Sequence, residues 1–300
     1  MSKLDYKLLN ALAKVVELQS FELAAKQLFI TQSAISQRIK RLEDSIGQPV
    51  LIRRQPLEVT ATGKALLKHY QLVKQLENDL LPEILPEQTR QPVKMTLAIN
   101  ADSLATWLIN ALSPILSTQL IELDLLIEHE ERTLEKLKSG EAIAAVSTEA
   151  KPLSGYHAIK LGEINYLLVA SKSFKARYFA QGVNAKSLKM APAVSFDHKD
   201  DMHVRFIAQH FKLNADQYYC HSVRSSEAFV AMAKQGLAYC LLPELQIKNL
   251  LAKGELVNLC EDKQLVETLY WHYWILAKGV YRNLSLQVIK QAQRILSSSV

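Results

Sequence analysis

The chain lacks the features that would indicate a disulfide framework or a familiar serine hydrolase. Its three cysteines, Cys220, Cys240 and Cys260, form no CxxC pair. Such an odd and widely spaced set makes no closed disulfide framework, so we expect buried, reduced thiols. No GxSxG segment occurs, and without that nucleophile turn the serines give little support to Ser-His-Asp catalysis. We therefore expect a protein that is not an enzyme and needs no cofactor.

Long apolar runs are absent as well. The longest uncharged stretch runs from Ser103 to Ile121, and several polar residues and Pro114 interrupt it. A soluble helix followed by a strand fits this stretch better than a membrane span. The first ten residues, MSKLDYKLLN, contain no apolar segment like that of a signal peptide. We therefore expect a cytoplasmic protein with no membrane partner.

Length and composition limit the domain count and the class of partner. The 300 residues exceed one usual domain and suit two or three, and a hydrophobic fraction of 49% is ample for several cores. The formal net charge of +6 favours a polyanionic partner only weakly, because an ordinary basic cytosolic protein can carry the same charge. The charge alone does not identify the partner.

The most informative stretch is residues 20–47, which reads as a short helix, a tight turn and a second helix. We expect Ser20 and Thr31 to cap the two helices, and Phe29 and Ile30 to make the turn and fill the space beneath it. In the second helix an apolar stripe recurs at steps of four, three and four, which predicts the face that packs inward. That stripe consists of Ile35, Ile39, Leu42 and Ile46.

The other sides of the second helix carry short hydrogen-bonding side chains. Such groups can reach base edges in a major groove that is wide enough for one helix. Flanking basic residues suit phosphate contacts, which fix register and give salt-dependent affinity. From the pattern alone, a solvated helix bundle with surface charge remains the alternative. The base-facing candidates are Gln32, Ser33, Ser36, Gln37 and Lys40, and the flanking basic residues are Arg38, Lys40, Arg41, Arg53 and Arg54.

The segment from Leu4 to about Thr62 resembles the winged helix-turn-helix of the LysR-type transcriptional regulators. The resemblance rests on FELAAKQLFITQSAISQRIKRLEDSIGQPVLIR and on the following LEVTATGKALL. One departure is Ser33, where many members carry a proline that would fix the first helical turn. The resemblance implies base contacts by Gln32, Ser33, Ser36 and Gln37 and phosphate contacts by Arg38 and Arg53.

A linker helix is expected after the wing, whose two short extended pieces lie in VLIRRQPLEVT with Pro56 at the turn. Its apolar stripe has little nearby sequence to cover it. The stripe could pack on its own first domain, but in LysR-type proteins the corresponding helix makes the dimer. We expect Pro82, Pro86 and Pro92 to break this helix and mark a hinge. The stripe consists of Leu66, Tyr70, Val73, Leu76 and Leu80.

From Val93 onward strand-like and helix-like segments alternate, which predicts a parallel sheet. A second series starts near Tyr166, and crossovers near Gly162 and Lys263 would join the two. This arrangement resembles the two-lobed effector domain of the LysR-type family, itself similar to periplasmic binding proteins. The expected architecture is an all-α-type winged helix-turn-helix DNA-binding domain (1–62), a linker helix and hinge (63–92), and a two-lobed α/β effector domain (93–300), with lobe I at about 93–162 and 264–300 and lobe II at about 163–263.

Ligands of such lobes bind in the crevice at the carboxyl ends of the strands. Asn100-Ala101-Asp102-Ser103 leads into a helix whose free N–H groups and dipole favour a carboxylate. Acidic residues in the neighbouring loops favour a cation, although each one taken singly could be a helix cap or a solvated surface acid. A zwitterion with an extra positive charge fits both features, so we expect lysine or arginine as the effector. The candidate effector-binding residues are Asp102, Ser103, Glu130, Ser147, Asp197 and His198, with Asp102, Glu130 and Asp197 for the cationic group.

Two other functional classes remain open. His198, Asp200, Asp201 and His203 could form a metal site, and with Glu130 a metal-assisted hydrolase, although their spacing matches no strong metal motif. An architectural or replication-control protein would bind DNA without promoter-specific regulation. Our main expectation is a sequence-specific transcriptional regulator that binds double-stranded DNA and a basic amino acid. It would form a dimer through the linker helix, with a tetramer and contact with RNA polymerase as further options.

Overall fold

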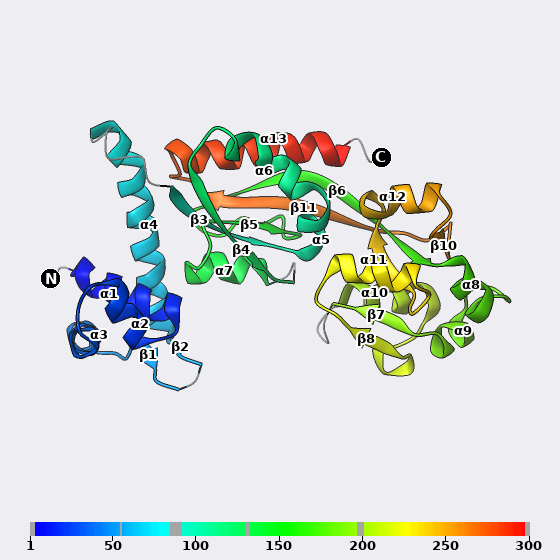
Figure 1. The fold of residues 1–300 in the computed structure, drawn as a ribbon, viewed down its shortest axis with the longest axis horizontal. Coiled ribbons are helices and arrows are strands. Elements are labelled where there is room, and N and C mark those ends of the chain that lie inside the picture. The colour runs from blue at the N-terminus through cyan, green and yellow to red at the C-terminus, as the bar shows by residue number, and fades with distance from the viewer. Residues whose placement is uncertain (1–3, 55, 85–91, 130–131, 197–200, 298–300) are drawn as a thin grey trace.

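The computed structural model describes residues 4–54, 56–84, 92–129, 132–196 and 201–297 of the chain. A small helical domain lies at one end, the long helix α4 stands beside it, and an elongated α/β part with two lobes extends from α4 (Figure 1). The order of these parts along the chain agrees with the architecture expected from the sequence. In the described part, no helix is both long enough and apolar enough to span a bilayer.

The helical domain consists of three helices and a short wing. The helices are α1 (Tyr6–Leu18), α2 (Phe21–Gln27) and α3 (Gln32–Ile46), and the wing pairs β1 (Leu51–Ile52) with β2 (Glu58–Val59) in antiparallel fashion. As predicted, the apolar stripe of α3 faces inward, because Ile35 and Ile39 are fully buried and Leu42 is 1% exposed. The stripe packs against α1 and α2 in one core.

Both predicted helix caps are confirmed. The Ser20 hydroxyl accepts a hydrogen bond from the backbone N–H of Leu23 at 3.2 Å, and the Thr31 hydroxyl accepts one from Ala34 at 3.1 Å. Each cap satisfies one of the N–H groups that a helix start leaves without an intrahelical partner. Gly47, with a φ of +75°, ends α3 in the left-handed conformation that favours glycine.

The prediction for Phe29 is wrong. Ile30 is half-buried against the core, but Phe29 is 95% exposed and fills no space beneath the turn. Its φ of +54° places it in the left-handed region, which costs a non-glycine residue about 1 kcal/mol or more. Local pattern did not reveal this backbone conformation, which directs the ring into solvent.

Helix α4 (Ala61–Ile84) is longer than the proline pattern suggested. It continues through Pro82 to Ile84, so Pro82 does not break it; Pro86 lies outside the described residues. In the first half of α4, Leu67 and Tyr70 are buried in the core of the helical domain. The second half presents apolar side chains to solvent, with exposed fractions of 42% for Leu76, 51% for Leu80 and 59% for Ile84.

The α/β part contains one large mixed sheet, not the parallel sheet that the alternating pattern predicted. Its strand order is β10-β6-β11-β5-β3-β4, with β9 also paired to β6. Strand β3 is parallel to β4 and β5, whereas β6 and β11 are antiparallel to their neighbours. The strands are β3 (Val93–Ile99), β4 (Ile121–Ile127), β5 (Ala144–Ser147), β6 (Tyr156–Ala170), β9 (Cys240–Pro243), β10 (Val257–Asn258) and β11 (Leu265–Trp274).

The two lobes are joined by the long strands β6 and β11, which run side by side from one lobe to the other (Figure 1). Their register shifts between Leu269 and Tyr270, opposite Gly162. Gly162 has a φ of +148°, and a Cβ there would lie 2.5 Å from the Cβ of Leu296. Glycine therefore permits both the bulge and the close packing of the last helix at this position.

Helices cover the sheet of the first lobe. A continuous helical segment comprises α5 (Ala101–Ser103), the π-helical turn Leu104–Leu108 and α6 (Ile109–Leu116), and α13 (Gly279–Ser297) packs against α6 and β6. On the opposite face α7 (Thr133–Ser139) packs on β5. The predicted helix in the uncharged stretch is thus confirmed.

The second lobe is built on the parallel pair β7 (Ala193–Ser195) and β8 (Cys220–Ser222) beside the far ends of β6 and β9. All three cysteines are free; Cys240 and Cys260 are buried, as expected, and Cys220 is half-buried. The helices of this lobe are α8 (Lys172–Tyr178), α9 (Ala185–Met190), α10 (Asp201–Phe211), the 3-10 turn Ala215–Gln217, α11 (Ser226–Lys234) and α12 (Glu244–Ala252).

Candidate functional sites

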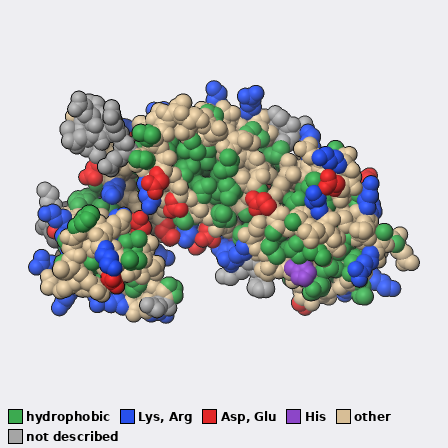
Figure 2. Space-filling model, in the orientation of Figure 1, with side chains coloured by type: hydrophobic (Ala, Val, Ile, Leu, Met, Phe, Trp, Pro, Cys, Tyr) green, Lys and Arg blue, Asp and Glu red, His purple; other side chains and the backbone are tan. Residues whose placement is uncertain are grey.

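The first candidate site is the outer face of α3. Gln32, Ser33, Gln37 and Lys40 are exposed, while Ser36 is half-buried beside them. These side chains share the helix with an apolar stripe that packs inward, so the helix can offer its polar face without disturbing its own core. Figure 2 shows Lys and Arg side chains along the outer edge of the helical domain.

The basic residues of this domain differ in their surroundings. Arg38 is half-buried on α3, and Arg53 is exposed at the end of β1. The guanidinium of Arg53 lies 5.5 Å from the ring centroid of Phe21, which holds it near the start of α2. Arg54 forms an ion pair with Glu58 across the wing. Arg53 is thus the wing arginine without a carboxylate partner in the described part.

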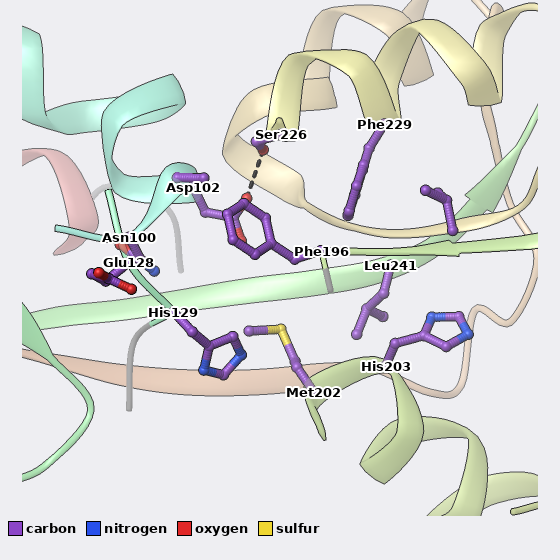
Figure 3. Close-up of a pocket in the computed structure, with 12 residues that line it drawn as sticks. Asn100, Asp102, Glu128, His129, Phe196, Met202, His203, Ser226, Phe229 and Leu241 are labelled. Carbon is purple, nitrogen blue, oxygen red and sulfur yellow. Dashed lines mark hydrogen bonds between the residues drawn. The ribbon is translucent and has the colours of Figure 1, made fainter. Parts of the chain in front are cut away.

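The second candidate site is a pocket between the two lobes. Its empty space, counted to the open mouth, is about 520 Å³. From the first lobe it is lined by residues that follow β3 and β4, the carboxyl ends at which the sequence predicted a crevice. In Figure 3, Asn100 and Glu128 lie on one side and Phe229 and Leu241 on the other. The lining residues are Asn100, Ala101, Asp102, Glu128, His129, Val194, Phe196, Met202, His203, Ser226, Phe229 and Leu241.

Asp102 joins the two lobes within this pocket. Its Oδ1 accepts a hydrogen bond from the Ser226 hydroxyl at 2.6 Å, and its Oδ2 accepts one from the Tyr166 hydroxyl at 2.9 Å. Ser226 and Tyr166 are each 1% exposed and lie on α11 and β6. Asp102 is half-buried, and hydrogen bonds to a carboxylate are stronger than those between neutral groups, so this contact links the first lobe to the second.

Glu128 is a pocket residue that the sequence analysis did not select. It follows β4, its side chain is 29% exposed, and its Oε1 lies 3.6 Å from the Nζ of Lys136. The adjacent His129 is 7% exposed and also lines the pocket. The run of acidic residues after β4 indicated this loop. The sequence did not show that β4 ends at Ile127, and therefore did not show which residues of the loop face the pocket.

The remaining effector candidates fall into two groups. Ser103 and Ser147 are buried, at 0% and 1% exposure, and are not among the residues that line the pocket. Both belong to regular elements, since Ser103 continues the helix that contains Asp102 and Ser147 ends β5. Glu130, Asp197 and His198 lie outside the described residues.

A metal site receives no support from the described part of the chain. Within it, no group of three or more His, Cys, Asp or Glu side chains is close enough to hold a metal ion. His203 lines the pocket, while Glu130, His198 and Asp200 are outside the described residues. The two histidines and the described carboxylates that line the pocket thus form no such group.

Apart from the loop after β7, where the sequence predicted Asp197 and His198, the second-lobe wall of the pocket had no sequence signal. Phe196 follows β7, Met202 lies on α10, and Ser226 and Phe229 lie on α11. Residues at helix starts and in apolar stripes look the same in sequence whether they line a pocket or a core. Ser226 follows Ser225, whose hydroxyl accepts a hydrogen bond from the Ala228 N–H and so caps α11.

Two family models match consecutive parts of the chain. Residues 6–64 match the model of the bacterial regulatory helix-turn-helix protein, lysR family, and residues 77–277 match the LysR substrate binding domain. The HTH-type transcriptional regulator ArgP of Aeromonas salmonicida is 52% identical over 296 residues, which cover 99% of each chain.

Two solved structures show how far the likeness extends in three dimensions. ArgP from Mycobacterium tuberculosis superposes with a TM-score of 0.83 at 34% identity, covering 97% of this chain and 98% of that one. Full-length LysG from Corynebacterium glutamicum with bound effector Arg gives a TM-score of 0.75 at 28% identity, with 97% and 99% covered.

These findings confirm the expected fold and the expected class of function. They favour a transcriptional regulator over the architectural protein considered above, because the relatives that match over the full length are transcriptional regulators. These relatives are not enzymes. A helix-turn-helix with an exposed polar reading face is joined to a two-lobed domain with a pocket between its lobes. The chain belongs to the LysR-type family of DNA-binding transcriptional regulators.

Proposed function

We propose that this regulator reads double-stranded DNA with the outer face of α3 and responds to a basic amino acid bound between its lobes. The exposed face of α3 supports base contacts in the major groove, and the wing supports contacts to the adjacent phosphates. The proposed base-facing residues are Gln32, Ser33, Ser36 and Gln37, and the proposed phosphate-contacting residues are Arg38, Lys40 and Arg53.

The proposed effector is arginine or lysine. The observation that carries this proposal is that Asp102 and Glu128 line the same pocket as the start of the helical segment 101–116. That helix start offers N–H groups and a partial positive charge to the ligand carboxylate. The two carboxylates offer acceptors to its ammonium or guanidinium group. LysG from Corynebacterium glutamicum binds arginine as its effector, which is consistent with this chemistry.

The two carboxylates would have different tasks. Both carboxylate oxygens of Asp102 already accept hydrogen bonds from hydroxyl groups. A ligand cation at Asp102 would therefore bind a carboxylate that is already held in place. The Glu128 side chain is 29% exposed, and among the described residues its carboxylate has only the 3.6 Å contact to Lys136, so it can turn toward a ligand. We therefore propose Glu128 as the main partner of the ammonium or guanidinium group on the ligand side chain. Glu130, Asp197 and His198 remain candidates from loops outside the described residues.

Calorimetric titration of the full-length protein with arginine and with lysine tests this assignment. We expect Glu128→Gln to weaken binding of the preferred ligand by about tenfold or more, since a charge-assisted hydrogen bond contributes roughly 1.5–3 kcal/mol. Asp216→Asn, an exposed acid on the 3-10 turn far along the second lobe, is the matched control. Equal affinity of the wild type and Glu128→Gln, or no binding of either amino acid, would overturn the effector assignment.

We also propose that two copies associate through α4. The side chains of Leu76, Leu80 and Ile84 recur at steps of four along one side of the helix, and in the described part of the chain they stay 42%, 51% and 59% exposed. The proposed division is a DNA-binding domain (1–62), a linker (63–92) and an effector domain (93–300). Since the partner is chromosomal DNA, we place the regulator in the cytoplasm, where contact with RNA polymerase and assembly into a tetramer are further options.

A further inference from the structure

The turn before the reading helix carries an unusual side chain. Phe29 is 95% exposed, the highest value of any large hydrophobic residue in the described ranges. Its φ of +54° is a conformation for which glycine or asparagine is the usual choice. The other non-glycine residues with positive φ in the described part, Gln19 and Lys212, are polar. An apolar ring thus stands in water on a backbone that does not favour it.

The backbone of this turn is well defined by hydrogen bonds. The N–H of Phe29 donates to the carbonyl of Lys26 at 3.2 Å, and the N–H of Ile30 donates to the carbonyl of Ala25 at 3.1 Å. Ile30 packs toward the core, so the ring of Phe29 projects away from it. The backbone at Phe29 is therefore held by hydrogen bonds, and the ring projects outward from a defined turn.

The position of the ring relative to α3 indicates what could cover it. Phe29 precedes Gln32, the first residue of α3, by three residues, so their Cα atoms lie within about 10 Å. In helix-turn-helix proteins the first residues of the reading helix contact base edges. A side chain that projects from the turn next to this helix start then lies at the edge of the groove. There the apolar surfaces on offer are deoxyribose faces and thymine methyl groups.

We propose that Phe29 is a DNA-contacting residue whose ring packs against deoxyribose or a thymine methyl group at the edge of the groove read by α3. This inference rests on the proposed reading surface and adds a nonpolar contact to its polar ones. A second copy of the chain is a less suitable occupant, because a protein seated on Phe29 would also cover Gln32 and Ser33 and block the reading face. The contact involves no charge, so its contribution to affinity does not depend on counterion release.

The test uses the full-length protein and a duplex that the wild type selects from a random-sequence pool. Phe29→Asn removes the ring and suits the left-handed backbone, so the variant should melt at or above the wild-type temperature. We expect its affinity for the selected duplex to fall about tenfold, as for the loss of a buried apolar contact of about 50–60 Å². The slope of log affinity against log salt should stay unchanged, whereas Lys40→Ala should reduce it by about one.

Controls separate this inference from the proposed function. Met190→Asn removes a 72% exposed apolar side chain in the second lobe and should leave DNA affinity unchanged. Phe29→Gly suits the same backbone and provides a second variant should asparagine disturb the turn. Wild-type affinity in both Phe29 variants overturns the inference, as does a lost oligomer in place of lost DNA affinity. Failure of the wild type to select any duplex counts instead against the proposed reading surface.

Discussion

The carboxylate of Glu17 lies 3.0 Å from the Nζ of Lys94, which joins α1 of the DNA-binding domain to β3 of the effector domain. Glu17 also pairs with Lys14 on its own helix at 2.7 Å. Burial raises the pKa of Glu17, but the hydrogen bonds and charges of Lys14 and Lys94 outweigh it and hold the pKa below its ordinary value. The pair is therefore charged at neutral pH and weakens only as pH falls through this lowered pKa.

Two further contacts dock α4 onto the effector domain. The amide of Asn78 donates to the Tyr281 hydroxyl at 2.9 Å, and the Asp79 carboxylate accepts from the backbone N–H of Lys278 at 3.1 Å, just before α13 begins. At the junction Figure 2 shows acidic side chains gathered between the helical domain and the first lobe. The DNA-binding arm is thus connected to the lobe that carries Asp102 and Glu128.

Reversing the charge of Glu17 or of Lys94 should alter the response to the effector more than it alters the stability of the protein. Glu17 and Lys94 have side chains that are 38% and 54% exposed, so the pair contributes at most about 1 kcal/mol. We expect Glu17→Lys or Lys94→Glu to shift the arginine concentration for half-maximal change in DNA binding by up to about fivefold. The double exchange should restore it. A double variant that behaves like the sum of the single ones would show that the two residues are not coupled.

Removing the Ser226 hydroxyl, which bridges the lobes, should lower the stability of the fold. Ser226→Ala removes one hydrogen bond from the half-buried Asp102 carboxylate, and we expect the free energy of unfolding to fall by about 1.5–3 kcal/mol in chemical denaturation. Ser222→Ala, at an exposed serine on β8, is the control and should change it by less than about 0.5 kcal/mol. Equal losses in both variants would mean that the contact between Ser226 and Asp102 does not hold the lobes together.

A charge on the exposed stripe of α4 should disrupt self-association. Leu80 is 51% exposed, and Leu80→Glu would place a carboxylate in the proposed helix-to-helix contact. We expect the mass from light scattering to drop below that of the wild type at the same concentration. Met190→Glu, at a more exposed position on the second lobe, should leave the mass unchanged. An unaltered assembly of Leu80→Glu would place the contact elsewhere.

His272 should make stability fall in mildly acidic solution. It is fully buried, and burial lowers its pKa below the ordinary value of 6.5, although the Glu149 carbonyl 2.8 Å from its Nε2 acts in the opposite direction. The unfolded chain therefore binds a proton more readily than the folded one, and stability decreases as pH falls through 6.5 toward the lowered pKa. Thermal unfolding from pH 8 to 5.5 should show this fall in the wild type and a shallower one in His272→Asn. Parallel curves would contradict it.

Local chemistry made the DNA-binding domain predictable. A serine or threonine hydroxyl before a helix, as at Ser20 and Thr31, and an apolar stripe through Ile35 and Ile39 act over a few residues, and the structure follows them. Phe29 was mispredicted because a left-handed turn depends on how two helices meet, which a hydrophobic pattern does not record. The prediction that Pro82 would break helix α4 was also wrong, since the helix continues through Pro82 to Ile84.

The effector domain was predictable in order but not in pairing. The first half of β6, near Tyr156, was not recognised, and its antiparallel pairing with β11 depends on residues more than a hundred positions away. The same holds for the pocket. The acidic loops after β3 and β4 were visible in the sequence, but the contact between Asp102 and Ser226 joins residues 124 positions apart. Only the folded sheet determines which loop residues face the second lobe.

The most direct test of the central claim is a footprint of the wild-type protein on its selected duplex, recorded with and without saturating arginine and lysine. The pocket and the reading helix lie in different domains joined through α4, so the ligand should change the arrangement of the DNA-binding arms more than the total affinity. We predict that at least one of the two amino acids changes the protected positions while affinity changes by a smaller factor. An identical footprint with both ligands at saturation would contradict the account.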